Sequence, residues 1–194
     1  MKRLIVGLIA SGAVALPAFA AIEQGAKAPD FKAQASLAGK EFSYSLKDAL
    51  KKGPVVVYFY PAAFTRGCNI QAHTFAKNMD KFKAAGASVI GVSLDKIDTL
   101  NEFSSDPEYC AGKLPVASDA DGKIAKSYDL KVSDGPPGGV TNSKGGKVEH
   151  GFTERTTFVV TKDGKVAATI GNMKPDENVM KALETVQHLK KPAA

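Results

Sequence analysis

Apolar positions along the chain follow two spacings, which predict strands and helices in turn. Residues 54–60 and 87–94 are short continuous apolar runs rich in β-branched and aromatic residues, and they predict buried central strands. Between them the spacing changes to that of one helical face, and Gly86 ends the pattern. The apolar positions of this face are Cys68, Ala72, Phe75, Met79 and Phe82.

A hairpin and further helices are expected after these elements. The stretches "RTTFVVT" from Arg155 and "KVAATIG" from Lys165 flank a "KDG" turn and predict a β-hairpin. Helical segments are expected at residues 98–103, at 121–130 and from Pro175 onward, while residues 133–147, with five glycines and two prolines, predict a long loop or loose hairpin. Strands alternating with helices predict one α/β domain of three layers, α/β/α, around a mixed central sheet.

The first twenty residues have the pattern of a secretory signal peptide. Lys2 and Arg3 precede an apolar stretch that ends at a small-x-small cleavage site, residues 18–20. The stretch is shorter than the roughly 20 residues of a membrane span. We therefore expect residues 1–20 to be removed, residues 21–194 to form the domain, and the mature protein to be exported, to the periplasm of a bacterium.

Charge and composition exclude several functions. Removal of Lys2 and Arg3 takes the formal net charge from +6 to +4, which is too mild to indicate a nucleic-acid partner or stable membrane association. The sequence shows no phosphate-binding glycine loop, no paired carboxylates and no metal-ligand spacing, so neither a cofactor nor a metal is expected.

The two cysteines, Cys68 and Cys110, permit a single structural disulfide in an exported protein. Cys68 lies where a predicted strand passes into a predicted helix, in the first turn if Thr65 is the N-cap. The positive end of a helix dipole stabilises a thiolate, and ligand sites of open α/β sheets form at such strand ends. Position alone leaves both a reactive thiol and an inert core cysteine open.

Pro61, Thr65 and Cys68 form the pattern P-x-x-x-T-x-x-C, which resembles the active-site motif of the peroxiredoxins, as does the stretch "FYP" that ends at Pro61. The resemblance covers nearly the whole mature chain, and "RTTFVVTKDGKV" is similar to the segment that supplies the family's active-site arginine, here Arg155. Within the family, the chain is most similar to the Q-type, or bacterioferritin-comigratory, subgroup. The resemblance implies a thioredoxin-like fold and a thiol-dependent peroxidase.

The resemblance also implies a role for each site residue. Cys68 would be the peroxidatic cysteine, whose thiolate attacks a hydroperoxide and becomes a sulfenic acid. Arg155 would stabilise the thiolate, and the Thr65 hydroxyl would orient the peroxide. Pro61 would cover the site, and backbone N–H groups near Gly67 and Cys68 would hold the peroxide oxygens. Taken alone, Thr65 could be only a cap, Arg155 a surface charge and Pro61 the end of a strand.

The chain departs from the common form of the subgroup, which has a glutamate three residues and a resolving cysteine five residues after the peroxidatic one. Gln71 and His73 stand at these positions, and Arg66 stands where proline is frequent. Cys110 is the remaining candidate for the resolving cysteine, and some members of the subgroup have theirs in that region. A disulfide needs Cα atoms within about 7 Å, so we expect local unwinding around one cysteine. Cys110 could instead be a bystander or part of a structural bridge.

The resemblance implies a peroxide substrate, a thioredoxin-like or other thiol reductant as partner, and a monomer or weak dimer. Two other functions remain open at this point. One is an exported structural or binding domain stapled by a Cys68–Cys110 disulfide. The other is a thiol-disulfide oxidoreductase, which would need a C-x-x-C pair where this chain has Gln71.

Overall fold

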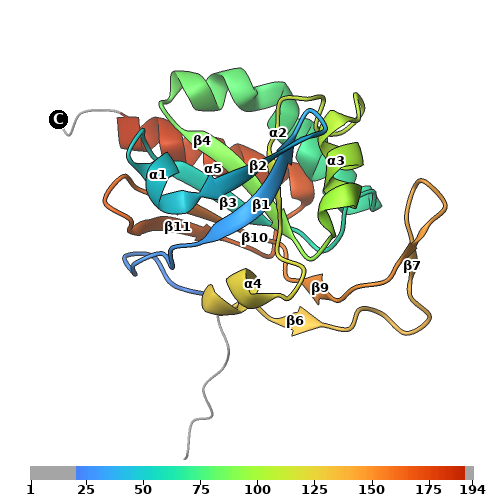
Figure 1. Ribbon diagram of the computed structural model, residues 1–194. Helices are drawn as coiled ribbons and strands as arrows, with labels where there is room; N and C mark the ends of the chain where they lie inside the picture. The colour runs from blue at the N-terminus through green and yellow to red at the C-terminus, as the bar shows by residue number, and fades with distance from the viewer. Residues whose placement is uncertain (1–20, 191–194) are drawn as a thin grey trace, which may run out of the picture.

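A seven-stranded mixed sheet forms the centre of the computed structural model, which describes residues 21–190 (Figure 1). The strand order is β11-β10-β3-β4-β5-β1-β2. Strands β3, β4 and β5 run parallel, and the other neighbours pair antiparallel. The strands are β1 (Lys32–Leu37), β2 (Lys40–Ser45), β3 (Val55–Phe59), β4 (Ser88–Ser93), β5 (Val116–Ser118), β10 (Thr156–Val160) and β11 (Val166–Ile170). The predicted signal peptide, residues 1–20, lies outside the described residues.

Helices cover both faces of this sheet. They are α1 (Leu46–Leu50), α2 (Arg66–Ala84), α3 (Ile97–Ser105), α4 (Lys123–Ser127) and α5 (Pro175–Lys190). Side chains of β3 alternate between the two cores because successive residues of a strand point to opposite faces. Val56 and Tyr58 join the cluster with α2, α3 and α5, whereas Val55 and Val57 join the cluster with α1 and α4. The expected three-layer α/β/α architecture with a mixed sheet is confirmed.

Most predicted elements are present with small changes in length. The helix expected at residues 121–130 is shorter, α4 alone. The Asp119 carboxylate accepts the N–H groups of Ile124 and Ala125 at its start, and Asp129 adopts a left-handed conformation (φ 56°) after its end. The antiparallel pair β1 and β2 at one edge of the sheet was not predicted as a hairpin. Within residues 21–190, no helix is both long and apolar enough to cross a membrane.

The long loop expected at residues 133–147 belongs to an excursion from the sheet (Figure 1). Two short antiparallel ladders organise it: β6 (Val132–Ser133) pairs with β9 (Phe152–Thr153), and β7 (Val140–Thr141) pairs with β8 (Lys147–Val148). The tip between β7 and β8 returns to the body of the domain, where the Ser143 N–H donates to the Phe64 carbonyl at 2.8 Å. The excursion thereby contacts the turn that leads into α2.

Candidate active site

The start of α2 is the geometric centre of the site. A bend at residues 61–65 joins β3 to α2, and it contains the half-buried Pro61. Thr65 is the N-cap residue, so Cys68 is the third residue of the helix and is buried. The Thr65 side chain makes no capping hydrogen bond. The first N–H groups of α2 therefore remain open toward the site, together with the positive end of the helix dipole.

The Thr65 hydroxyl has a different partner from the one a helix cap would use. It donates its single proton to the Ala62 carbonyl at 2.8 Å. The position of Thr65 at the N-cap is confirmed, but its side chain closes the preceding turn instead of capping the helix. Because a hydroxyl has one proton and two lone pairs, Thr65 can still accept a hydrogen bond from a group that enters the site.

Arg155 reaches Cys68 across the sheet. Its Nη2 donates to Cys68 Sγ at 3.3 Å. The register of β10 on β3 explains this contact: Thr156 pairs with Phe59 at the end of β3, which places the preceding Arg155 beside the start of α2. A guanidinium has donors only, and it places a positive charge directly against the sulfur.

Gly67 allows the guanidinium to lie against the helix. A Cβ added at Gly67 would stand 3.0 Å from Arg155 Nη2, closer than ordinary packing permits. The same Cβ would lie 3.6 Å from the Pro175 ring at the start of α5. Gly67 therefore leaves room for the close approach of Arg155 to the first turn of α2.

A chain of buried amides continues from Arg155 into the core. Arg155 Nη1 donates to Gln71 Oε1, and Gln71 Nε2 donates to Asn178 Oδ1 at 3.0 Å. Asn178 Oδ1 also accepts from the Thr157 hydroxyl at 2.6 Å, while Asn178 Nδ2 donates to the Ile170 carbonyl at 3.0 Å.

Asn178 and Thr157 were not identified from the sequence. A signal was present, because Asn178 lies on the apolar face of α5, four and eight residues before the buried Ala182 and Val186. A polar residue on such a face needs buried partners.

Cys110 lies in a turn segment after α3, defined here as residues 106–113. It is a free thiol and is fully buried, as part of the same core cluster as Cys68, which is also a free thiol. Burial raises the pKa of the Cys110 thiol well above its ordinary value, and the nearby Asp106 carboxylate raises it further. Cys110 in this packing is a poor nucleophile, since the thiolate is the reactive species. The core packs around both cysteines with no disulfide between them.

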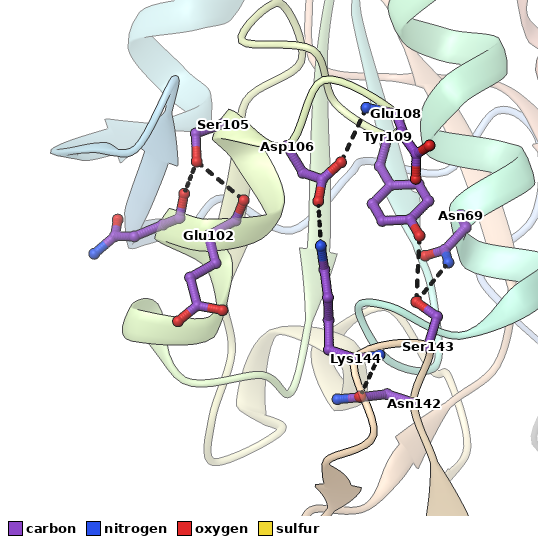
Figure 2. Close-up of polar contacts among 10 residues, drawn as sticks. Asn69, Glu102, Ser105, Asp106, Glu108, Tyr109, Asn142, Ser143 and Lys144 are labelled. Carbon is purple, nitrogen blue, oxygen red and sulfur yellow. Dashed lines mark hydrogen bonds and ion pairs between the residues drawn. The ribbon is translucent and has the colours of Figure 1, made fainter.

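A group of polar contacts, named here the clasp, links residues 106–113 to the tip between β7 and β8 and to α2 (Figure 2). Its two central residues are Ser143 and Lys144 at the tip between β7 and β8. Lys144 Nζ lies 2.7 Å from the Asp106 carboxylate, and the Ser143 hydroxyl lies 3.3 Å from both the Tyr109 hydroxyl and Asn69 Nδ2 of α2. The Lys144 ammonium also lies over the ring of Phe64, 5.3 Å from its centroid. The clasp thus joins the segments that carry both cysteines.

His73 makes one further contact to the Cys110 segment. Its Nδ1 lies 2.8 Å from the Glu108 carbonyl, and it must be the donor because a carbonyl only accepts. The His73 side chain is exposed. No group of three His, Cys, Asp or Glu side chains within residues 21–190 is placed to hold a metal ion.

Comparison with known proteins assigns the chain to a family. The AhpC/TSA family model matches residues 24–169, a range that includes both cysteines and Arg155. The chain belongs to the AhpC/TSA family. It is 33% identical over 175 residues to peroxiredoxin Q of Sedum lineare, covering 89% of this chain and 82% of the relative. It is 32% identical over 168 residues to a putative peroxiredoxin bcp of Helicobacter pylori, covering 85% and 98%.

Solved structures agree with this assignment. The chain is similar to peroxidoxin BcpB of Mycobacterium tuberculosis, with a TM-score of 0.71 and 29% identity over 88% of this chain and 99% of that one. It is also similar to the bacterioferritin comigratory protein of Xanthomonas campestris, with a TM-score of 0.64 and 25% identity over 81% and 92%. The chain is therefore a peroxiredoxin with a thioredoxin-like fold, and it is a thiol-dependent peroxidase. The predicted resemblance to the Q-type subgroup is confirmed.

Proposed function

We propose that this peroxidase reduces hydrogen peroxide and organic hydroperoxides at Cys68, and that Cys110 then resolves the oxidised cysteine through an intramolecular disulfide. The observation that carries the proposal is the Arg155–Cys68 hydrogen bond of 3.3 Å at the open N-terminus of α2. The Arg155 charge and the first N–H groups of α2 therefore lie where negative charge develops on sulfur and oxygen during the attack.

The first step is a displacement on oxygen. The Cys68 thiolate attacks the terminal peroxide oxygen, a sulfur–oxygen bond forms, and the oxygen–oxygen bond breaks. The leaving oxygen takes a proton and departs as water or an alcohol, which leaves a sulfenic acid on Cys68. Thr65 accepts the hydrogen bond of the incoming peroxide, because its own proton is held by Ala62. The N–H groups of Gly67 and Cys68 stabilise the negative charge that develops on oxygen, and Pro61 covers the site.

The second step joins the two cysteines. Sulfur of Cys110 attacks sulfur of the Cys68 sulfenic acid, a disulfide forms, and the hydroxyl group leaves as water. Burial and the raised pKa of Cys110 mean that this attack requires local opening of residues 106–113. A thioredoxin-like or other thiol reductant then returns both cysteines to thiols.

Two observations support this scheme over the alternatives. Residue 71, the position a C-x-x-C oxidoreductase would need, is a buried glutamine bonded to Arg155. A stapled structural domain needs its disulfide, whereas both cysteines here are free within a closed core. The comparison with the Xanthomonas protein, whose structure is described in terms of alkyl peroxide reduction, supports organic hydroperoxides as substrates.

We also propose that residues 1–20 direct export and that the mature protein, from residue 21, acts in the bacterial periplasm as a monomer or weak dimer. The support for export is the tripartite pattern of the N-terminus, and the monomer or weak dimer is inferred from the resemblance to the Q-type subgroup. Expression of the full-length chain in a bacterium and N-terminal sequencing of the periplasmic product tests this directly. A mature N-terminus near Ala21 supports export, and an intact chain confined to the cytoplasm contradicts it.

Peroxide consumption tests the function itself. Wild type, Cys68→Ser and Cys110→Ser are supplied with hydrogen peroxide or cumene hydroperoxide and with either dithiothreitol or a thioredoxin system. Cys68→Ser should consume neither peroxide. Cys110→Ser should keep turnover with dithiothreitol, which can reduce a sulfenic acid directly, and should lose most turnover with thioredoxin. Wild-type turnover in Cys68→Ser would refute the proposal.

A further inference from the structure

Asn178 is fully buried, and its side chain contacts three other elements. It lies on α5 and bonds to Gln71 of α2, Thr157 of β10 and the Ile170 carbonyl of β11. Thr157 and Ile170 are direct partners in the β10–β11 ladder, so one point of the sheet holds both sides of the Asn178 amide. Arg155 immediately precedes β10, which ties the same point to the active site.

A single backbone carbonyl determines the direction of each hydrogen bond in the series that links Asn178, Gln71 and Arg155. The Ile170 carbonyl only accepts, so Asn178 must turn Nδ2 toward it and Oδ1 toward Gln71. Oδ1 in turn only accepts, so Gln71 must present Nε2 to Asn178. Gln71 Oε1 is then the atom left to face Arg155, which can only donate.

The amide that holds Arg155 in place, Gln71, is uncharged. None of the ion pairs within residues 21–190 includes Arg155, and its side-chain bonds go to Gln71 and Cys68. An amide fixes the guanidinium without cancelling its charge, so the full positive charge remains directed at sulfur. Without the bond to Asn178, the Gln71 amide would lose its fixed position, and the guanidinium would lose the fixed partner that holds it beside Cys68.

We infer that Asn178 is a positioning residue for the peroxidase reaction: anchored by Ile170 and Thr157, it holds the Gln71 amide in the one orientation that points Arg155 at Cys68. Asn178 acts through Gln71 and touches neither sulfur nor peroxide. This inference rests on the proposed roles of Cys68 and Arg155.

The test compares Asn178→Leu, a variant of similar volume without the amide, with Val186→Ala, a core truncation on the same helix outside the amide chain. Peroxide reduction, the pH profile of Cys68 alkylation by iodoacetamide, and Tm are measured for each. Asn178→Leu should react with peroxide about 10- to 100-fold more slowly, the loss expected from a misplaced catalytic group. Its alkylation profile should move to higher pH. Val186→Ala should lower Tm without moving the profile.

A double variant separates positioning from stability. If Asn178 acts through Gln71, then Gln71→Met with Asn178→Leu should react no more slowly than Gln71→Met alone, since the shared link is already broken. Multiplied losses in the double variant would overturn the inference, as would a wild-type rate and profile in Asn178→Leu. Should Asn178→Leu fail to fold, Thr157→Val removes the other donor to Asn178 Oδ1, and a wild-type rate and profile there would equally overturn it.

The outcome also separates this inference from the proposed function. A wild type that reduces peroxide and a Cys68→Ser variant that does not would uphold the function even if Asn178→Leu behaved as wild type. A slower peroxide reaction in Asn178→Leu supports the positioning role only when the wild type itself reacts through Cys68.

Discussion

Arg155 donates a hydrogen bond to Cys68 across 87 residues of sequence, at 3.3 Å, because β10 pairs with the strand that leads into the Cys68 helix. The sheet register, the missing side-chain cap on α2 and the glycine at position 67 all permit this one contact. The contact between Arg155 and the Cys68 thiol is thus a property of where strands β3 and β10 end.

Loss of the Arg155 charge should slow the reaction with peroxide. Arg155→Met removes a charge-assisted hydrogen bond of about 1.5–3 kcal/mol, which corresponds to a loss of roughly 10- to 100-fold. Stopped-flow measurement of peroxide reduction checks this. Arg66→Met is the matched control, since Arg66 is an exposed arginine in the same helical turn as Cys68. Equal rates in wild type and Arg155→Met would contradict the role of the guanidinium.

Gly67→Ala should separate stability from activity. Alanine in place of glycine stabilises a helix by roughly 0.5–1 kcal/mol, but its Cβ would stand 3.0 Å from Arg155 Nη2 and push the guanidinium aside. We expect an unchanged or higher Tm with about 10-fold slower peroxide reduction. A variant that is as active as wild type would show that Arg155 tolerates displacement.

Gln71→Glu should impair the enzyme although glutamate is the common residue of the subgroup at this position. A carboxylate only accepts hydrogen bonds, so it would face Asn178 Oδ1, whose orientation is determined by Ile170. The buried pair of acceptors should cost about 1–3 kcal/mol of stability. The carboxylate would also offset the Arg155 charge, so the peroxide reaction should slow. Thermal unfolding and stopped-flow kinetics measure the two effects, and a gain in both would show that the amide chain can reverse.

Weakening the clasp should accelerate disulfide formation and leave the peroxide step unchanged. Lys144→Met removes the ion pair to Asp106 over the Cys110 segment. A pair of this exposure contributes about 1 kcal/mol or less, so we expect a few-fold faster appearance of the Cys68–Cys110 disulfide after peroxide. Lys147→Met, an exposed lysine of the same hairpin, is the control. Slower resolution in Lys144→Met would mean that the clasp promotes the encounter of the two cysteines.

Stability should fall as pH rises through the titration of His150. Both of its ring nitrogens face acceptors, the Gly151 carbonyl at 2.7 Å and the Asp95 carboxylate at 2.9 Å, so the bonded form is the imidazolium. Burial lowers the pKa of His150, but the hydrogen bond and charge of Asp95, with the Gly151 carbonyl, outweigh it and raise the pKa above its ordinary value. The stabilisation is fully present below the ordinary histidine pKa and is lost as pH passes the raised one.

Thermal unfolding across this pH range tests the His150 pair. The Tm of the wild type should fall as pH increases from about 6 to 8, the range in which histidine titrates. The Tm of His150→Gln should fall by less over the same range. His188→Gln, at an exposed histidine 3.8 Å from Glu184, should behave as wild type. The same pH dependence in wild type and His150→Gln would show that the Asp95 pair contributes nothing to it.

The sequence predicted those parts of the fold that depend on local pattern. The apolar stripe from Cys68 to Phe82, the continuous run of β3 and the hairpin after Arg155 all follow from periodicity. The local motif located Cys68, and the separate stretch that begins at Arg155 located the arginine. The contact between them depends on pairing between strands far apart in sequence, which periodicity does not encode.

Other parts could not be predicted because they depend on tertiary contacts. Thr65 occupies the expected N-cap position of α2, but its hydroxyl oxygen accepts no capping hydrogen bond, and the hydroxyl donates to the Ala62 carbonyl within the bend at residues 61–65. The clasp arises from a glycine-rich loop whose tip carries only Ser143 and Lys144 as contacts, a composition typical of any exposed turn. The amide chain was visible only as one polar residue, Asn178, on an apolar face.

Intact mass of the reduced mature protein, taken within seconds of adding one equivalent of hydrogen peroxide, tests the central claim most directly. Wild type should lose two hydrogens as the Cys68–Cys110 disulfide forms, Cys110→Ser should gain one oxygen on Cys68, and Cys68→Ser should keep its mass. Oxygen on Cys68 in both wild type and Cys110→Ser would keep the peroxidatic role and remove the resolving one. An unchanged mass in the wild type would contradict the account of Cys68 as the reactive thiol.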